Sequence, residues 1–158
     1  MKTKIVTLNK LLEILKKERI GKKIVTTNGA FDILHPGHID SLTRAKKLGD
    51  ILIVCINTDS SVKQNKGDKR PINSEKDRAF ALSALECVDY VTSFPEKDPR
   101  QILKMIKPNI HAKGSDRKMS EIIEKQIVEE NGGKIILLPY QKGHSTTDII
   151  EKIKEAYK

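Results

Sequence analysis

The sequence predicts an α/β fold of the Rossmann-like type, a doubly wound parallel sheet of five strands with helices on both faces. Short apolar or β-branched runs alternate with helical periods from one end of the chain to the other. One run, Ile51 to Ile56, is apolar at every position, which is typical of a strand covered on both faces. The 158 residues fit one domain over 1–158, because no repeat or linker interrupts them.

The first half of the chain predicts helices and strands in strict alternation. Leucines at positions 8, 11, 12 and 15 fall on one face of a helix that ends near Gly21. Asn73 and Ser74 cap a later helix, and Asp77 lies in its first turn. The expected elements are a helix over 8–21, a strand over 23–27, a turn at Asn28 and Gly29, a helix over 36–48, a strand over 51–56 and a helix over 74–85.

The second half continues the alternation. The lysine-rich segment Gln64 to Pro71, which precedes it, predicts a long active-site flap without secondary structure. Ser145 is expected to cap the last helix. The remaining elements are a strand over 88–92, a helix over 99–106, a strand over 109–112, a helix over 120–130, a strand over 135–138 and a helix from 145 to the C-terminus.

Composition limits the partners. Lys and Arg total 30 against 21 acidic residues, so the net charge of +9 favours anions such as phosphates. Six scattered aromatic residues provide no stacking platform, and nucleic acid is therefore not expected. No apolar run could span a membrane and no secretory signal is visible, which predicts a cytoplasmic protein without a membrane partner. Cys55 and Cys87 lie in apolar surroundings and predict reduced core thiols.

Two histidines follow the first predicted strand. In parallel sheets the ligand lies beyond the carboxyl ends of the strands, and His35 and His38 stand there at the start of a helix. Their spacing aims two imidazoles and free backbone amides at one anion. A lone histidine is usually structural, but two at this place favour a functional role. A zinc site would need a third ligand, and only Asp32 is near in sequence.

The segment from Val25 to His38 resembles the HxGH signature of the nucleotidylyltransferase superfamily. Further segments make the chain similar to the heptose 1-phosphate adenylyltransferases over about Ile5 to Ile153. These segments are Asn57–Lys63, Arg70–Asn73, Ala84–Asp89, Lys113–Asp116 and Ser145–Thr147. The resemblance is to the adenylyltransferase half of a bifunctional ADP-heptose synthase, without the sugar-kinase half.

The resemblance implies an activity. ATP would condense with a sugar 1-phosphate, D-glycero-D-manno-heptose 1-phosphate, to give an ADP-sugar and pyrophosphate for cell-surface polysaccharide such as lipopolysaccharide. The sugar phosphate is already an anionic nucleophile, so the reaction needs only positioning and charge stabilisation. Mg²⁺ would bridge the phosphates. A separate sugar kinase upstream and a homo-oligomer, a dimer, are the expected partners.

Site residues follow from this reading. His38 is assigned to the α-phosphate and His35 to the triphosphate beside it, with Lys63 and Lys66 completing the catalytic set. Arg70 and Arg78 are candidates for the acceptor phosphate. Arg78 could instead be a surface partner of Ser74 or Glu75. The predicted nucleotide-binding residues are Asn28, Gly29, Ala30, Phe31, Gly37, His38, Asn57, Asp59, Lys113, Gly114, Asp116, Ser145, Thr146 and Thr147.

Two of these positions, Ser145 and Asp116, have two interpretations. Ser145 is expected to cap the last helix, while Thr146 and its neighbours hold the β- and γ-phosphates. Asp116 could contact the nucleotide or cap the helix that follows it. The histidines at 111 and 144 carry no assigned role.

The chain departs from the family pattern at three places. Ala30 stands where the family commonly has Cys. Ser115 stands where the family has the second Gly of a Lys-Gly-Gly-Asp motif, and Arg117 stands where it commonly has Tyr. The last two changes bear on base preference. One alternative is therefore a cytidylyltransferase acting on glycerol 3-phosphate or another small phosphorylated alcohol, although Tyr140-Gln141 differs from the Arg-Thr of that branch. The second alternative is a non-catalytic module that binds a nucleotide or RNA. The pair His35 and His38 disfavours this alternative, because binding alone does not need two imidazoles at the reacting phosphorus.

Overall fold

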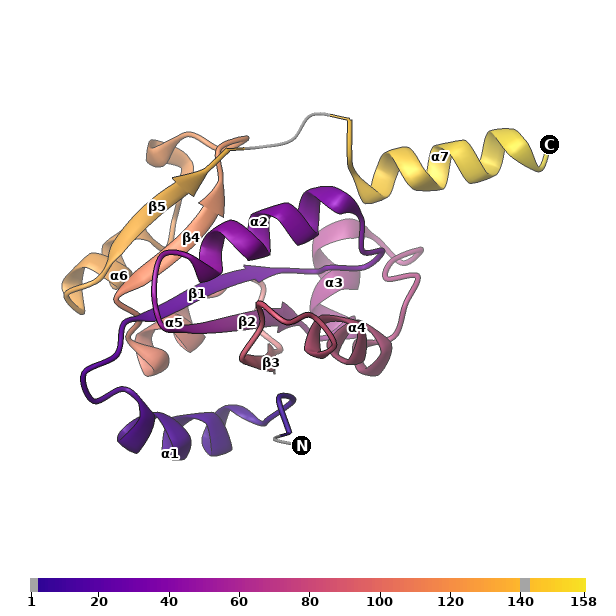
Figure 1. Cartoon of the computed structure of the whole chain (residues 1–158). Helices are drawn as coiled ribbons and strands as arrows, with labels where there is room; N and C mark the ends of the chain where they lie inside the picture. The colour runs from indigo at the N-terminus through magenta and orange to yellow at the C-terminus, as the bar shows by residue number, and fades with distance from the viewer. Residues whose placement is uncertain (1–2, 140–142) are drawn as a thin grey trace.

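The fold is a five-stranded parallel sheet in the order β3-β2-β1-β4-β5 (Figure 1). The computed structural model describes residues 3–139 and 143–158, so Tyr140 and Gln141 lie outside the described residues. The strands are β1 (Ile24–Gly29), β2 (Ile51–Asn57), β3 (Tyr90–Phe94), β4 (Ile110–Gly114) and β5 (Lys134–Leu138). All neighbouring pairs are parallel, as the apolar runs predict.

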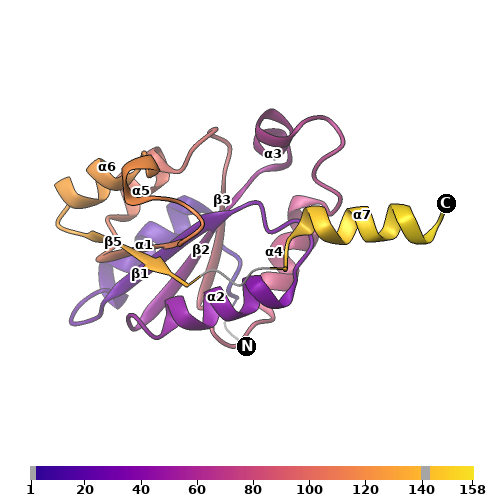
Figure 2. The ribbon, with the colours of Figure 1, turned by 90° about the horizontal axis from the view of Figure 1, so that it is seen from above.

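Helices cover both faces of this sheet (Figures 1 and 2). One apolar cluster joins the sheet to α1, α5 and α6, and a second joins it to α2 and α4. The expected doubly wound α/β architecture is therefore confirmed. The helices are α1 (Leu8–Glu18), α2 (Pro36–Lys46), α3 (Asp59–Lys66), α4 (Glu75–Ser83), α5 (Arg100–Ile106), α6 (Lys125–Glu130) and α7 (Thr146–Ala156), with a 3-10 turn η1 (Met119–Glu121) before α6.

The central strand β2 shows why the sequence specifies two covered faces. All seven of its residues are buried. Ile51, Ile53 and Cys55 join the α1/α5/α6 cluster, while the alternate residues Leu52 and Val54 join the α2/α4 cluster. Side chains of a strand alternate between faces, so a strand buried on both sides is apolar throughout.

Three sequence predictions are wrong. Asn28 and Gly29 end β1 instead of forming a turn. The predicted flap begins as a helix, because α3 runs to Lys66. The composition of this segment does not indicate a helix, because Asp, Ser, Val and Asn are poor helix formers. The Thr58 side chain nevertheless caps the helix by accepting from the Ser61 backbone N–H. The helix predicted over 120–130 is divided into η1 and α6. The other boundaries move by one to three residues.

The last helix, α7, projects away from the sheet (Figures 1 and 2). None of its residues is buried, and its attachment in the described part of the chain is at its first turn, where the Thr146 hydroxyl donates to the Ile33 carbonyl. Within residues 3–139 and 143–158, no helix is both long and apolar enough to cross a bilayer.

Candidate active site

The strand order reverses between β1 and β4. From β1 the chain moves outward to β2 and β3, then returns to the other side of β1 to form β4. Ligands of such sheets bind beyond the carboxyl ends of the strands at this reversal. Asn28 and Gly29 end β1 there, and Lys113 and Gly114 end β4. The predicted nucleotide-binding residues of both strands therefore lie at one edge.

The two predicted catalytic histidines stack on each other at the start of α2. Their ring centroids are 3.7 Å apart with planes inclined by 22°. His35 is the N-cap of α2, and its Nδ1 accepts from the His38 backbone N–H at 3.3 Å. The proton of a neutral His35 ring must then be on Nε2, which leaves that atom a donor. Gly37 permits the packing, because a Cβ there would lie 3.1 Å from His35 Nδ1.

Both rings are uncharged in the free protein near neutral pH. Burial, the neighbouring His35 and Lys66 lower the pKa of His38 to about 4. Burial and the nearby His144 also lower the pKa of His35. His38 Nδ1 is buried and has no hydrogen-bond partner among the described residues. A buried polar atom without a partner is costly unless a ligand satisfies it, which is consistent with a binding role.

We expect this pair to make the protein less stable in mild acid. The folded-state pKa of His38 is about 4, below the ordinary value of 6.5. The unfolded chain therefore binds more protons between these values, and the stability present above pH 6.5 is lost as the pH falls toward 4. From pH 7 to pH 5 the free energy of unfolding attributable to His38 should fall by about 2 kcal/mol.

Urea unfolding at the two pH values tests this expectation. The His38→Gln variant should lose less stability than the wild type over the same interval. Equal losses in the two proteins would show that His38 does not carry the acid sensitivity.

The segment between β1 and α2 is fixed by the packing of Phe31 and by hydrogen bonds to Asp32. Phe31, at φ 48°, packs against the His38 ring with centroids 5.1 Å apart. Asp32 is 2% exposed and accepts from Arg70 and from the backbone N–H groups of Ile72 and Asn73. Burial alone would raise the pKa of Asp32, but these hydrogen bonds lower it below its ordinary value. The pairing fixes the segment that carries the histidines to the loop before α4.

Arg78 is buried, and the alternative of a surface position is wrong. The residue is 1% exposed, and its guanidinium donates to the backbone carbonyls of Ala30, Asn57 and Asn73 at 2.6 to 3.1 Å. It also pairs with Asp59 at 2.9 Å. The acceptor-phosphate role is thus disfavoured by geometry, because these donors are already engaged. Arg78 instead joins the ends of β1 and β2, and it positions two predicted nucleotide-binding segments.

Cationic side chains gather beside the histidines. Lys66 ends α3 close enough to His38 to lower the pKa of that ring. Partial desolvation, then Arg70 and Arg117, lower the pKa of Lys66 itself. Three cations near one another, with Asp32 as the nearby counter-charge, make a site that favours an anion. Lys63 is exposed one turn earlier on the same helix.

Lys113 and Asp116, two predicted nucleotide-binding residues, lie at and just after the end of β4. Lys113 donates to Asn28 Oδ1 at 3.0 Å. Asp116 is exposed, and its carboxylate folds toward Gly114, where an added Cβ would lie 2.6 Å from Oδ1. The alternative that Asp116 caps the next helix is wrong, because Lys118 occupies the N-cap of η1.

The start of α7 lies on the same side as the histidines. Ser145 caps α7 by accepting from the Asp148 N–H at 3.0 Å, as predicted. The Thr146 hydroxyl donates to the carbonyl of Ile33, three residues before α2 begins at Pro36, and Thr147 is exposed. His144 stands beside His35 with ring centroids 6.5 Å apart. These contacts place the predicted phosphate cradle next to the histidine pair.

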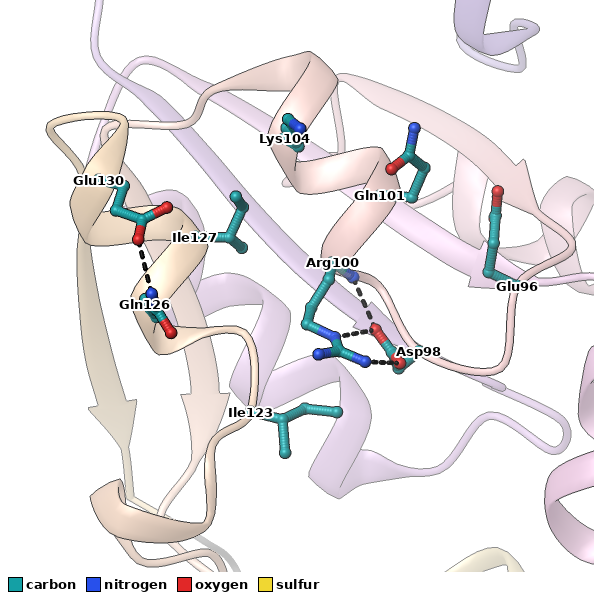
Figure 3. Close-up of a pocket in the computed structure, with 9 residues that line it drawn as sticks. All are labelled: Glu96, Asp98, Arg100, Gln101, Lys104, Ile123, Gln126, Ile127 and Glu130. Carbon is teal, nitrogen blue, oxygen red and sulfur yellow. Dashed lines mark hydrogen bonds and ion pairs between the residues drawn. The ribbon is translucent and has the colours of Figure 1, made fainter.

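A groove between α5 and α6 is the competing candidate for a functional site. No group of three or more metal-ligating side chains lies together in residues 3–139 and 143–158. Asp32 is engaged by Arg70 and two amides and is not free to ligate. Figure 3 shows a surface groove between α5 and α6, where Arg100 pairs with Asp98 and Gln126 with Glu130. The guanidinium of Arg100 and the amide of Gln126 are thus engaged by carboxylates of the groove itself, so the groove is a weaker candidate than the histidine edge.

Two residues without any recognisable local motif connect to this edge in the structure. Glu124 and His111 are buried next to Lys113. Glu124 stands among other glutamates in an ordinary amphipathic segment, and no local pattern distinguishes it. A histidine inside a predicted apolar strand was the one available signal of a buried polar network.

The fold and the site define a nucleotidyltransferase-type α/β domain with a histidine-bearing helix start at the sheet reversal. Comparison with known proteins agrees, since the model of the cytidylyltransferase-like family matches residues 26–152. The chain belongs to the cytidylyltransferase-like family. The resemblance to the adenylyltransferase half of a bifunctional enzyme is confirmed by relatives that carry the name bifunctional protein HldE.

The chain is 51% identical over 154 residues to the bifunctional protein HldE of Helicobacter pylori strain J99. It is 44% identical over 155 residues to the HldE of Geobacter metallireducens. Each match covers 98% of this chain but 32% of the relative, so the chain spans about a third of the length of these relatives.

Solved structures give the same fold. A lipopolysaccharide core biosynthesis protein from Thermoplasma volcanium is 34% identical, with a TM-score of 0.65, over 78% of this chain and all of that one. A pantoate-beta-alanine ligase from Francisella tularensis has a TM-score of 0.68 at 21% identity and covers 97% of this chain and 77% of its own. The second likeness concerns the fold alone.

Proposed function

We propose that residues 1–158 form one adenylyltransferase domain that condenses ATP with a sugar 1-phosphate, D-glycero-D-manno-heptose 1-phosphate, to give ADP-heptose and pyrophosphate. The observation that supports this most directly is the stacked His35–His38 pair at the edge where β1 and β4 end. The HldE relatives and the lipopolysaccharide core biosynthesis protein support the choice of a glycan precursor as substrate.

The reaction is an in-line displacement at phosphorus. A phosphate oxygen of the sugar 1-phosphate attacks the α-phosphorus of ATP, a new P–O bond forms, and the bond to the bridging oxygen of pyrophosphate breaks. No proton must be removed from the nucleophile, because it is already anionic. The protein therefore contributes positioning and stabilisation of the negative charge that builds on the α-phosphate.

The chain's own donors suit these tasks. His38 is assigned to the α-phosphate, and His35, with its donor on Nε2, to the phosphates beside it. Lys66, Arg70 and Arg117 supply positive charge on the side of α3. The first backbone N–H groups of α7, with Thr146 and Thr147, are proposed to hold the β- and γ-phosphates.

Mg²⁺ is proposed to accompany the triphosphate and to neutralise part of its charge. Magnesium usually keeps several waters and binds substrate phosphates through few protein ligands. This fits the described residues, in which Asp32 is committed to Arg70 and to backbone amides. A cytoplasmic location, a homodimer and a separate sugar kinase that supplies the substrate belong to the same proposal.

The two lysines of α3 should differ in their kinetic effects. Lys66→Ala should raise the KM for ATP or the sugar phosphate about tenfold, the equivalent of one charge-assisted hydrogen bond. Lys63→Ala should raise the same KM less, because Lys63 is exposed and Lys66 lies beside His38, Arg70 and Arg117. Steady-state kinetics with each substrate varied in turn measures both effects. If neither variant changes a kinetic constant, the two lysines are solvated charges outside the site.

Nucleotide choice tests the proposed function. Pyrophosphate release should be measured with ATP, CTP, GTP and UTP at one fixed concentration of heptose 1-phosphate, and with glycerol 3-phosphate as the alternative acceptor. We expect the highest kcat/KM with ATP, because base reading by backbone groups would tolerate Ser115 and Arg117. A preference for CTP and glycerol 3-phosphate would establish the cytidylyltransferase alternative. Nucleotide binding without pyrophosphate release would establish a non-catalytic module.

A further inference from the structure

A chain of polar side chains runs from the interior of the sheet to its active edge. Thr26 Oγ1 lies 2.8 Å from His111 Nδ1, and His111 Nε2 lies 3.4 Å from Glu124 Oε1. The same carboxylate oxygen lies 2.7 Å from Lys113 Nζ, which donates to Asn28 Oδ1 at 3.0 Å. Three of the five side chains are buried, and the chain of contacts ends at a predicted nucleotide-binding residue.

Charge explains why these groups stay together. Glu124 is 3% exposed, and a buried carboxylate is strongly destabilising unless a cation compensates it. Burial alone would raise the pKa of Glu124, but His111 and Lys113 lower it to about 2, so the group is ionised. Asp98 and Arg100 stand near enough to interact with it from the side of α5. The ammonium in direct contact is that of Lys113.

The donors and acceptors have one consistent order. An ionised carboxylate only accepts, so a neutral His111 carries its proton on Nε2, the nitrogen that faces Glu124 at 3.4 Å. Its Nδ1 is then the acceptor for the Thr26 hydroxyl at 2.8 Å, a shorter contact than the 3.5 Å from that hydroxyl to the Ile110 carbonyl. Burial lowers the pKa of His111, which agrees with this neutral ring. An ammonium only donates, so Asn28 must turn its oxygen toward Lys113 and keep its two amide N–H donors for other partners.

We propose that Glu124 is a positioning residue of the nucleotide site, which holds the Lys113 ammonium against Asn28 and so fixes the end of β1 beneath the bound nucleotide. This inference rests on the proposed function. Glu124 acts from the N-cap of α6, across β4, and belongs to none of the segments that carry the family resemblance.

The position of Asn28 explains why the effect should reach the ligand. Asn28 is followed by Gly29, Ala30 and Phe31, and the Phe31 ring packs on His38. Arg78 holds the Ala30 carbonyl at 2.6 Å. The segment over 28–31 is thus tied at one end by the Glu124–Lys113 pair and in its middle by Arg78. Loss of the first tie should free Asn28 and the Lys113 side chain, while His35 and His38 keep their place on α2.

The test is Glu124→Gln, which keeps the shape and removes the charge. The KM for ATP should rise about tenfold, and kcat should stay within about threefold of the wild type. A purely structural role predicts another result, because partial unfolding lowers the apparent kcat and leaves KM unchanged. The matched control is Glu129→Gln on the same helix, where the exposed Glu129 lies 3.9 Å from Lys125 and should leave both constants unchanged.

A double-mutant cycle connects the effect to Lys113. Glu124→Gln combined with Lys113→Ala should raise KM no more than Lys113→Ala does alone, because both remove the same tie. An unchanged or lowered KM for Glu124→Gln, or factors that multiply in the double variant, would overturn the inference.

The four proteins of this cycle, which are the wild type, Glu124→Gln, Lys113→Ala and the double variant, should be titrated with ATP by calorimetry. A wild type that binds ATP without turnover would refute the proposed function, and the ratios of Kd would still decide the role of Glu124. A wild type that binds no ATP would overturn both.

Discussion

Replacing His38 with alanine should lower kcat about 100- to 1000-fold and change the KM for ATP little. The contact of His38 with the α-phosphate strengthens only as charge builds in the transition state, and loss of one such donor usually costs two to three orders of magnitude. The stacking of His38 on His35, at 3.7 Å between centroids, positions the ring for this contact. The rate of pyrophosphate release at saturating ATP and sugar phosphate measures kcat for the variant and the wild type.

The control for His38→Ala is the neighbouring Ile39→Ala. Ile39 is 43% exposed on the same helical turn, so its removal should leave kcat unchanged. Thermal unfolding of both variants shows whether the fold persists. Near-normal turnover of His38→Ala would remove His38 from the mechanism.

Replacing Arg78 with alanine should destabilise the fold by about 3 kcal/mol, since it leaves buried carbonyls unpaired and opens a cavity. The carbonyls of Ala30, Asn57 and Asn73 lose their donor together. For a chain of this size the expected fall in Tm is roughly 6 to 12 °C. Arg78→Lys should restore at most part of the lost Tm, because one ammonium cannot reproduce the planar, forked hydrogen-bond donors of a guanidinium.

Arg44→Ala is the matched control for this experiment. Arg44 pairs with Asp40 one turn away on α2 and is exposed, so its loss should leave Tm unchanged. The two roles considered for Arg78 predict opposite results. A direct contact with the acceptor phosphate would raise the KM for the sugar phosphate and leave Tm unaltered, whereas the buried network predicts a large fall in Tm.

The fold class could be predicted from the sequence because the burial of a strand or helix determines a local pattern of apolar residues. A strand such as β2, covered on both faces, must be apolar at every position, and helices with one covered face repeat their apolar residues at helical spacing. The helix starts at Ser74 and Ser145 were predicted for the same local reason, since each side-chain oxygen accepts from a backbone N–H three residues later.

The predictions failed where local preference and tertiary packing disagree. Asn28 and Gly29 favour a turn by themselves, yet pairing with Cys55 and Ile56 in β2 extends β1 through them. The segment that forms α3 contains poor helix formers, yet burial of Ser61 and Val62 beside the sheet stabilises it as a helix.

The sequence by itself determined that His35 and His38 stand at a helix start after a buried strand, because two residues three apart share a helix end wherever that helix packs. Only the tertiary structure decided the burial and the partners of Arg78 and Glu124. Arg78 looked like a surface residue of a helix and is buried against three carbonyls. Glu124 looked like a solvated charge and is the buried partner of Lys113. Both contacts join residues distant in sequence, and side-chain partners across such distances are fixed by the packing of sheet and helices rather than by any local pattern.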